Sequence, residues 1–86
     1  MLKFEYLFLL NGGDNLYKRI KFLREDKNLN QTQIAKILNM SQTGYSKYET
    51  GENDIPTKIL IALADFYETS IDYLLDRTDN PTPYKK

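Results

Sequence analysis

The sequence predicts one all-helical domain of five helices, preceded by a short N-terminal extension. Apolar residues recur at intervals of three and four from Leu16 onward, which is the spacing of one face of a helix. Residues suited to begin or end helices separate these apolar stripes. A chain of 86 residues can close one hydrophobic core and has too few residues for a second domain.

Each expected helix is defined by its apolar stripe. The first helix covers about residues 16–27, the second ends near Asn39 and the third covers residues 42–50. The fourth follows Pro56, which suits the start of a helix, and the fifth follows Ser70. In chain order, the stripes consist of Leu16, Ile20 and Leu23; Ile34, Ala35 and Leu38; Tyr45 and Tyr48; Ile59, Leu60, Leu63, Ala64, Phe66 and Tyr67; and Ile71, Leu74 and Leu75.

Capping residues support these boundaries. Asn30 and Gln33 have the spacing of a reciprocal capping box. Asn39 tolerates a left-handed backbone and Gly51 favours it, so each is expected to end a helix. Gly44 lies inside the third helix, where glycine costs up to about 1 kcal/mol relative to alanine, which suggests a close backbone approach. The candidate N-cap residues are, in order, Asp14 or Asn15, Asn30, Ser41 and Ser70.

The composition excludes most catalytic chemistry and most metal sites. The chain has no cysteine and no histidine, so it can form no disulfide, no thiolate nucleophile and no imidazole zinc site. We therefore expect no enzymatic activity, no cofactor and no metal. No small-molecule effector is evident from the sequence.

The charged residues balance overall but are unevenly distributed. Twelve Lys and Arg oppose twelve Asp and Glu in the whole chain. Residues 16–51 carry seven basic and three acidic side chains, whereas residues 52–79 carry two basic and seven acidic ones. A small domain polarised in this way can present one face to a polyanion. Ordinary solvated helix faces would produce the same pattern, so charge alone does not identify a nucleic-acid-binding protein.

Two short helices joined by a tight turn form a predicted helix-turn-helix. Residues 29–51, LNQTQIAKILNMSQTGYSKYETG, resemble the corresponding segment of the Cro/phage-repressor (XRE) family. Ala35 stands where that family keeps a small residue between the two helices, and the resemblance covers residues 16–78. It implies a five-helix, lambda-repressor-like DNA-binding domain. The family's buried positions correspond to Leu38, Met40, Tyr45 and Tyr48.

The resemblance also implies roles for individual side chains. Arg24 and Glu49 correspond to a structural ion pair between the first and third helices. Glutamine can contact adenine N6 and N7, lysine can reach guanine O6 and N7, and the threonine methyl can meet a thymine methyl. The residues expected to read bases are Gln42, Thr43, Ser46 and Lys47. The residues expected to hold phosphates are Gln31, Thr32, Lys36 and Lys58.

Three features depart from the family pattern. Asn39 replaces the glycine that many members have in the turn, which is physically compatible with a left-handed backbone. Glu52 and Asp54 stand after the third helix, where many relatives carry basic residues, and they weaken the expected affinity for DNA. Gly44 on the third helix removes one potential base or phosphate contact.

The first fifteen residues lie outside the resemblance. Alternation of apolar residues from Leu2 to Leu10 favours an extended strand that pairs with a second copy of the chain. Alternatively, residues 1–15 are translated leader, because residues 11–14 can be encoded by a purine-rich, ribosome-binding-site-like run before a start at Leu16. Residues 1–10 are too few to cross a membrane and lack the features of a signal peptide, so we expect a cytoplasmic protein. Residues 79–86 are expected to form a flexible tail.

Together these features predict a sequence-specific DNA-binding transcriptional regulator of bacterial or phage origin. It is expected to be a repressor that binds a palindromic operator as a homodimer, with half-sites about 34 Å apart. The alternative is a protein-interaction module, such as an antitoxin or anti-repressor, that uses the same helical domain. In that case four aromatic residues would form the partner patch: Phe66, Tyr67, Tyr73 and Tyr84. The first three of them could instead belong to the core or to a dimer interface.

Overall fold

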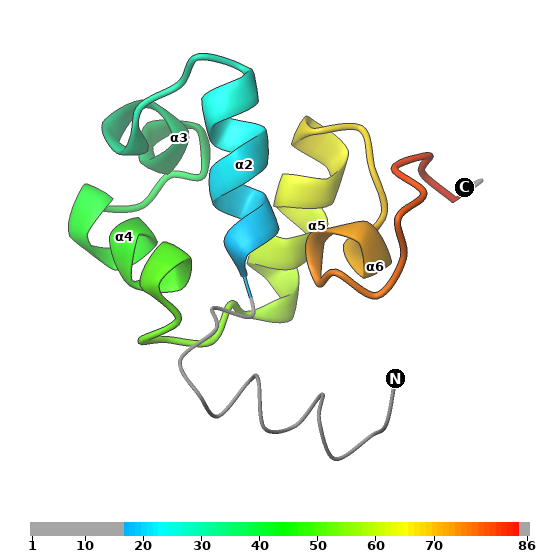
Figure 1. Cartoon of the computed structure of the whole chain (residues 1–86). Helices are drawn as coiled ribbons and strands as arrows, with labels where there is room; N and C mark the ends of the chain where they lie inside the picture. Colours follow the sequence, from blue (N-terminus) through cyan, green and yellow to red (C-terminus); the bar gives the residue numbers. More distant parts are fainter. Residues whose placement is uncertain (1–16, 85–86) are drawn as a thin grey trace.

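The computed structural model describes residues 17–84, and this part of the chain is entirely helical (Figure 1). The all-helical prediction is therefore confirmed. The strand expected near the N-terminus lies outside the described residues. No helix within residues 17–84 is long and apolar enough to cross a membrane. The five helices are α2 (Lys18–Asp26), α3 (Gln31–Ile37), α4 (Gln42–Thr50), α5 (Thr57–Phe66) and α6 (Ile71–Leu74).

Helix α2 lies between two helix pairs, with α3 and α4 on one side and α5 and α6 on the other (Figure 1). Every helix contributes to a single core, because each buries one apolar stripe against its neighbours. Ile55, in the connection before α5, is also buried. The buried apolar residues are Tyr17, Ile20, Ile34, Ala35, Tyr45, Tyr48, Ile55, Leu63, Ala64, Tyr67 and Leu74.

Three of the predicted N-caps are confirmed. The Gln33 backbone N–H donates to Asn30 Oδ1 at 2.8 Å, and the Asn30 backbone N–H donates to Gln33 Oε1 at 2.8 Å, which completes the capping box. The Gly44 N–H donates to Ser41 Oγ at 3.0 Å at the start of α4. The Ser70 hydroxyl accepts the corresponding bond at the start of α6, also at 3.0 Å. These bonds satisfy backbone donors that have no partner within their helix.

The start of α2 differs from the prediction. The helix begins at Lys18, and its N-cap is Tyr17, which makes no side-chain cap. The predicted caps, Asp14 and Asn15, lie outside the described residues, so the boundary moves two residues along the chain. Tyr17 is buried in the core, and its hydroxyl donates to Asp54 at 3.1 Å. Packing of this ring, rather than a capping bond, fixes the entry to the helix.

The segment after α6 lies against the helical bundle. The Arg19 guanidinium donates to the Thr78 carbonyl at 2.8 Å and to the Asp76 carboxylate at 2.6 Å. Farther along, the Thr69 hydroxyl donates to the Pro81 carbonyl at 2.6 Å. Contacts therefore extend into residues 79–86, whose expected flexibility stays a prediction.

Candidate DNA-binding surface

Helices α3 and α4 form the helix-turn-helix. The connection turns sharply at Asn39, whose φ of 57° is left-handed, and the Met40 N–H donates to the Ala35 carbonyl at 2.9 Å. Ala35 and Tyr45 are almost completely buried where the two helices meet. The small alanine allows this close approach, so α4 is held rigidly on α3.

Gly44, in the first turn of α4, lies close to two neighbouring side chains. A Cβ atom at this position would lie 3.1 Å from Ser41 Oγ and 3.2 Å from Met40 Cε. Both atoms belong to side chains, so they do not amount to the close backbone approach that the sequence suggested. Glycine at this position leaves room for the capping hydroxyl and for the methionine beneath the first turn of α4.

A buried ion pair joins α2 to α4. Arg24 Nε donates to Glu49 Oε2 at 2.6 Å, and Arg24 Nη2 donates to Glu49 Oε1 at 3.0 Å. Arg24 Nη1 also donates to the Leu29 carbonyl at 2.8 Å, before α3. Both charged side chains are buried. This two-pronged geometry fixes the orientation of α4 relative to α2, because moving either helix would separate buried charges.

Glu49 accepts two further hydrogen bonds. The Tyr45 hydroxyl donates to Oε2 at 2.6 Å, and Gln31 Nε2 donates to Oε1 at 3.0 Å. Burial alone would raise the pKa of the Glu49 carboxyl, but the bonds from Arg24, Tyr45 and Gln31 outweigh it and lower the pKa. The carboxylate is therefore held in its charged form.

A chain of hydrogen bonds connects this buried site to the surface. Gln42 Nε2 donates to Gln31 Oε1 at 2.6 Å, and Gln31 in turn donates to Glu49. Gln42 is exposed, so its side chain is braced from behind while one face remains accessible. From the sequence, Gln31 was expected to contact a DNA phosphate, and its contact with Gln42 was not predicted. One signal was present: both glutamines directly follow a helix N-cap.

The four candidate base-reading residues share one side of α4. Gln42 and Thr43 are exposed in the first turn, and Ser46 and Lys47 are half-buried one turn later. Lys47 Nζ lies 3.7 Å from Glu52 Oε2 in the following loop. The acidic loop residue therefore pairs with a candidate base-reading side chain, a contact that sequence alone did not indicate.

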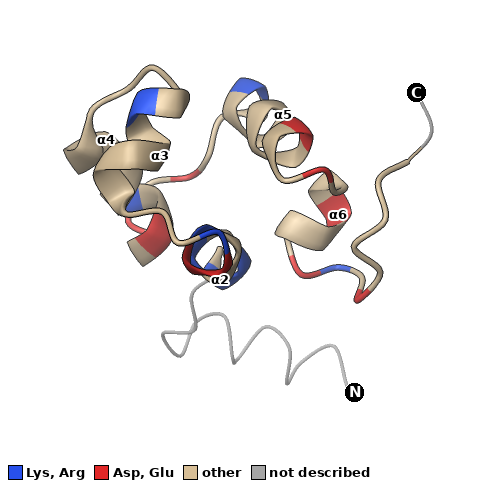
Figure 2. Ribbon diagram, turned by 90° about the horizontal axis from the view of Figure 1, so that it is seen from above, with Lys and Arg blue, Asp and Glu red and all other residues tan. Residues whose placement is uncertain are grey.

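The remaining phosphate candidates are exposed on two helices. Thr32 and Lys36 are four residues apart on α3 and so share a face, while Lys58 lies in the first turn of α5. Figure 2 shows acidic segments on α5, α6 and the chain after α6, and also beside α4 and in the connection before α5. The charge polarity of the sequence is therefore only partly reproduced in space.

The aromatic residues considered as a partner patch do not form one exposed surface. Tyr67 is buried in the core, and its ring packs edge-on against Phe66, with ring centroids 5.0 Å apart. Tyr73 is half-buried beneath the Arg19 guanidinium, 4.0 Å from the ring centroid. Tyr84 is exposed. Of the two interpretations of these residues, the core position is therefore confirmed for Tyr67, and the four aromatic residues do not form one exposed patch.

Comparison with known proteins places the helix-turn-helix in a family. The helix-turn-helix family profile matches residues 20–74. The HTH-type transcriptional regulator YobD of Bacillus subtilis is 33% identical over 66 residues, which are 77% of this chain and 59% of that protein. The phage transcriptional repressor RstR of Vibrio cholerae is 38% identical over 60 residues, 70% of this chain and 54% of that protein.

A third relative, the HTH-type transcriptional activator BcrR of Enterococcus faecalis, is 36% identical over 58 residues. These residues are 67% of this chain and 28% of that protein. The chain therefore spans about half the length of YobD and RstR, and less of BcrR. No solved structure matches the chain significantly.

Proposed function

We propose that this chain, which belongs to the Cro/phage-repressor (XRE-type) helix-turn-helix family, binds DNA sequence-specifically and represses transcription. In this proposal it occupies a palindromic operator as a homodimer and excludes the polymerase. The observation that carries the proposal is the exposed Gln42, which Gln31 braces against the buried Glu49. A side chain fixed in this way can read a base edge with little loss of conformational freedom.

The binding geometry follows from the position of α4. We place this helix in the major groove, with Gln42, Thr43, Ser46 and Lys47 toward the base edges. Thr32, Lys36 and Lys58 would contact the flanking phosphates, and the free N–H of the Gln31 amide could do the same. In a two-fold dimer the second copy would present the same surface about one helical turn away.

The acidic residues limit the strength of this interaction. The Lys47 ammonium would have to exchange its pairing with Glu52 for a contact with DNA. Helices α5 and α6, which carry Asp65 and Asp72, lie on the other side of α2 from the helix-turn-helix (Figure 1). We therefore expect modest affinity that falls steeply as salt rises, because phosphate contacts release counterions.

Selection from a pool of randomised DNA duplexes tests the proposed function. Enrichment of a palindromic site, bound more tightly than a scrambled duplex, is the expected result. A reporter gene placed behind the enriched site then measures whether occupancy lowers or raises transcription. Absence of any enriched sequence at low salt would refute sequence-specific binding, and increased transcription would refute the repressor role.

Substitutions distinguish the two classes of contact. Gln42→Ala is expected to relax the preference at one base position by about 1–3 kcal/mol. Thr32→Ala, the control on α3, is expected to weaken all duplexes alike. If Gln31 positions Gln42, Gln31→Ala reduces the same base preference and is non-additive with Gln42→Ala. Equal losses on all duplexes for every variant would contradict base reading by Gln42.

A further inference from the structure

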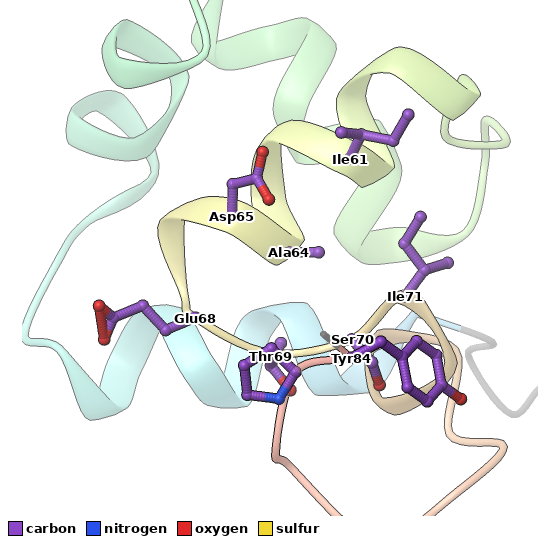
Figure 3. A pocket seen from close by; sticks show the side chains of 9 residues that line it. Ile61, Ala64, Asp65, Glu68, Thr69, Ser70, Ile71 and Tyr84 are labelled. Carbon is purple, nitrogen blue, oxygen red and sulfur yellow. The ribbon is translucent and has the colours of Figure 1, made fainter. Parts of the chain in front are cut away.

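A groove lies between α5, α6 and the chain after α6 (Figure 3). Its volume is about 580 Å³, and Figure 3 shows Ile61 and Ile71 at one end and Glu68 at the other. The proposed DNA contacts use α3, α4 and the start of α5 and leave this groove unexplained. The lining residues are Ile61, Ala64, Asp65, Glu68, Thr69, Ser70, Ile71, Pro83 and Tyr84.

Large apolar side chains are exposed at this groove. Within residues 17–84, four large hydrophobic residues are exposed, and two of them, Ile61 and Tyr84, line the groove. The exposed fraction of Ile61 is 48% and that of Tyr84 is 67%. Two such residues beside one concave surface favour an apolar occupant.

The chain itself contains an apolar segment that lies outside the residues matched by the family profile. The match begins at residue 20, and residues 1–10 read MLKFEYLFLL. In an extended conformation, alternate side chains share one face. The even-numbered face then consists entirely of apolar and aromatic residues: Leu2, Phe4, Tyr6, Phe8 and Leu10.

This segment is joined to the domain close to the groove. Arg19, in the first turn of α2, donates to the Tyr73 carbonyl at 3.2 Å, near the end of α6. Helix α6 has four residues and is about 6 Å long, and Ile71 at its start lines the groove. Residues 11–16 can span about 20 Å when extended, and they include two glycines that permit a reversal of direction.

We propose that residues 2–10 bind in this groove of the same chain, with the even-numbered side chains against Ile61, Ile71 and Tyr84. A short connection gives the segment an effective concentration on the order of millimolar, so a contact with a dissociation constant below this value keeps the groove mostly occupied. The even-numbered apolar residues would then pack in the groove of their own chain, whereas in the strand-paired dimer the segment would pair with a second copy. It is independent of the proposed DNA binding.

Limited proteolysis of the full-length protein tests this contact. Chymotrypsin cleavage after Phe8, followed by mass spectrometry, reports the accessibility of the segment. Ile61→Lys places a charge in the groove and is expected to accelerate this cleavage at least about tenfold. Ile37→Lys is the matched control, because Ile37 on α3 is 49% exposed and lies outside the groove. Equal cleavage rates in the two variants would overturn the proposal.

The same assay shows whether the segment binds the groove of its own chain or the groove of a second copy. Protection that is unchanged by about a hundredfold dilution supports binding within one chain. Protection that disappears on dilution would place the segment in a second copy and overturn the proposal as stated.

A second measurement does not depend on the folding of Ile61→Lys. In the full-length Phe4→Asp/Phe8→Asp variant, the methyl NMR signals of Ile61 and Ile71 are expected to shift, because the segment leaves the groove. Leu7→Asp/Leu9→Asp changes the opposite face by the same charge and is expected to leave these signals in place. Equal shifts, or no shift in either variant, would overturn the proposal whatever the outcome of the DNA-binding tests.

Discussion

Glu49 is a buried carboxylate whose charge is maintained by donors from three helices. Arg24 on α2, Gln31 on α3 and Tyr45 on its own helix α4 all donate to it. Despite its burial, these bonds lower the pKa of the carboxyl below the ordinary value of 4.5. The ion pair therefore specifies how the three helices meet, and protonation of one group would weaken all three connections.

The lowered pKa of Glu49 makes stability depend on acid pH. As the pH falls, the unfolded chain binds a proton at Glu49 before the folded protein does. The charged Glu49 therefore contributes fully to stability above pH 4.5. This contribution is lost as the pH falls through the lower pKa of the folded state. Glu49→Gln is expected to lower the free energy of unfolding at pH 7 by about 3 kcal/mol and to flatten the acid dependence. Denaturant unfolding at several pH values measures both, with Glu25→Gln as the exposed control. An unchanged acid slope in Glu49→Gln would contradict this assignment.

Two buried tyrosines should respond in opposite ways to loss of the hydroxyl. The Tyr67 hydroxyl has no hydrogen-bond partner within the described part of the chain, and burial raises the pKa of this group to about 12. Tyr67→Phe is expected to stabilise the protein by about 1 kcal/mol, because it removes an unsatisfied polar group. Tyr45→Phe removes a donor to Glu49 and should destabilise it by about 1–3 kcal/mol. Thermal unfolding measures the difference, and a destabilised Tyr67→Phe would indicate a hidden partner.

At the level of single side chains, the sequence indicated the residues of the candidate site but not the side chains that contact them. Gln42 and Lys47 were assigned through the resemblance to the Cro/phage-repressor family, whose base-facing positions they occupy, and their role in reading bases stays a prediction. Their partners, Gln31 and Glu52, could not be assigned, because side-chain contacts depend on how helices and loops approach one another. The inward position of Tyr67, by contrast, agrees with its place on the apolar stripe of the fourth predicted helix.

The five described helices end in the same way. Each is followed by a residue with a left-handed backbone, with φ between 55° and 79°. Asn39 and Gly51 were predictable because their side chains tolerate or favour this conformation. Glu68 and Asp76 were not predicted, although the turns that follow α5 and α6 are closed by the same kind of local backbone hydrogen bonds, Thr69 N–H to the Ala64 carbonyl and Arg77 N–H to the Asp72 carbonyl. The left-handed residues are Asn28, Asn39, Gly51, Glu68 and Asp76.

Glu68 offers a direct test of this backbone cost. Its φ is 55°, a conformation that costs an ordinary side chain about 1–2 kcal/mol and glycine much less. Glu68→Gly is expected to stabilise the protein by about 0.5–1 kcal/mol after the greater entropy of unfolded glycine is subtracted. The same substitution in a right-handed helix, Glu25→Gly in α2, should destabilise it by about 1 kcal/mol. Chemical denaturation of the pair measures the sign, and destabilisation by both would contradict the prediction.

The number and order of helices were predictable because apolar spacing and capping are local properties. The capping box at Asn30 and the hydroxyl caps at Ser41 and Ser70 all appear as expected. The start of α2 was not predictable, because Tyr17 ends the connection by burying its ring near Asp54, a residue distant in sequence. Local signals thus define elements well, except where tertiary contacts replace a cap.

Within residues 17–84, α2 connects the helix-turn-helix to the part of the chain that contains α5 and α6. Arg24 on α2 binds the helix-turn-helix through Glu49, and Arg19 on the same helix binds the chain around α6. The two arginines are five residues apart, so they project from different sides of the helix. One helix therefore positions both the candidate DNA-binding surface and the acidic half that carries the groove.

Arg19 is expected to hold the chain after α6 in place. Its guanidinium donates to the carbonyls of Tyr73 and Thr78 and to the carboxylate of Asp76, and it stacks on the Tyr73 ring. Only the planar guanidinium can make these contacts together, because lysine has one compact charged group. Its side chain is 16% exposed, so solvent screens these bonds only in part.

Arg19→Ala should therefore destabilise the protein by about 1–3 kcal/mol and free the chain after α6. Arg19→Lys should restore only part of this stability. Lys18→Ala is the control, because Lys18 is exposed, lies 3.6 Å from the Asp76 carboxylate and should contribute little. Trypsin cleavage after Arg77 measures the release directly and should accelerate in Arg19→Ala but not in Lys18→Ala. If cleavage accelerates only in proportion to global unfolding, Arg19 stabilises the whole fold and does not specifically hold this segment.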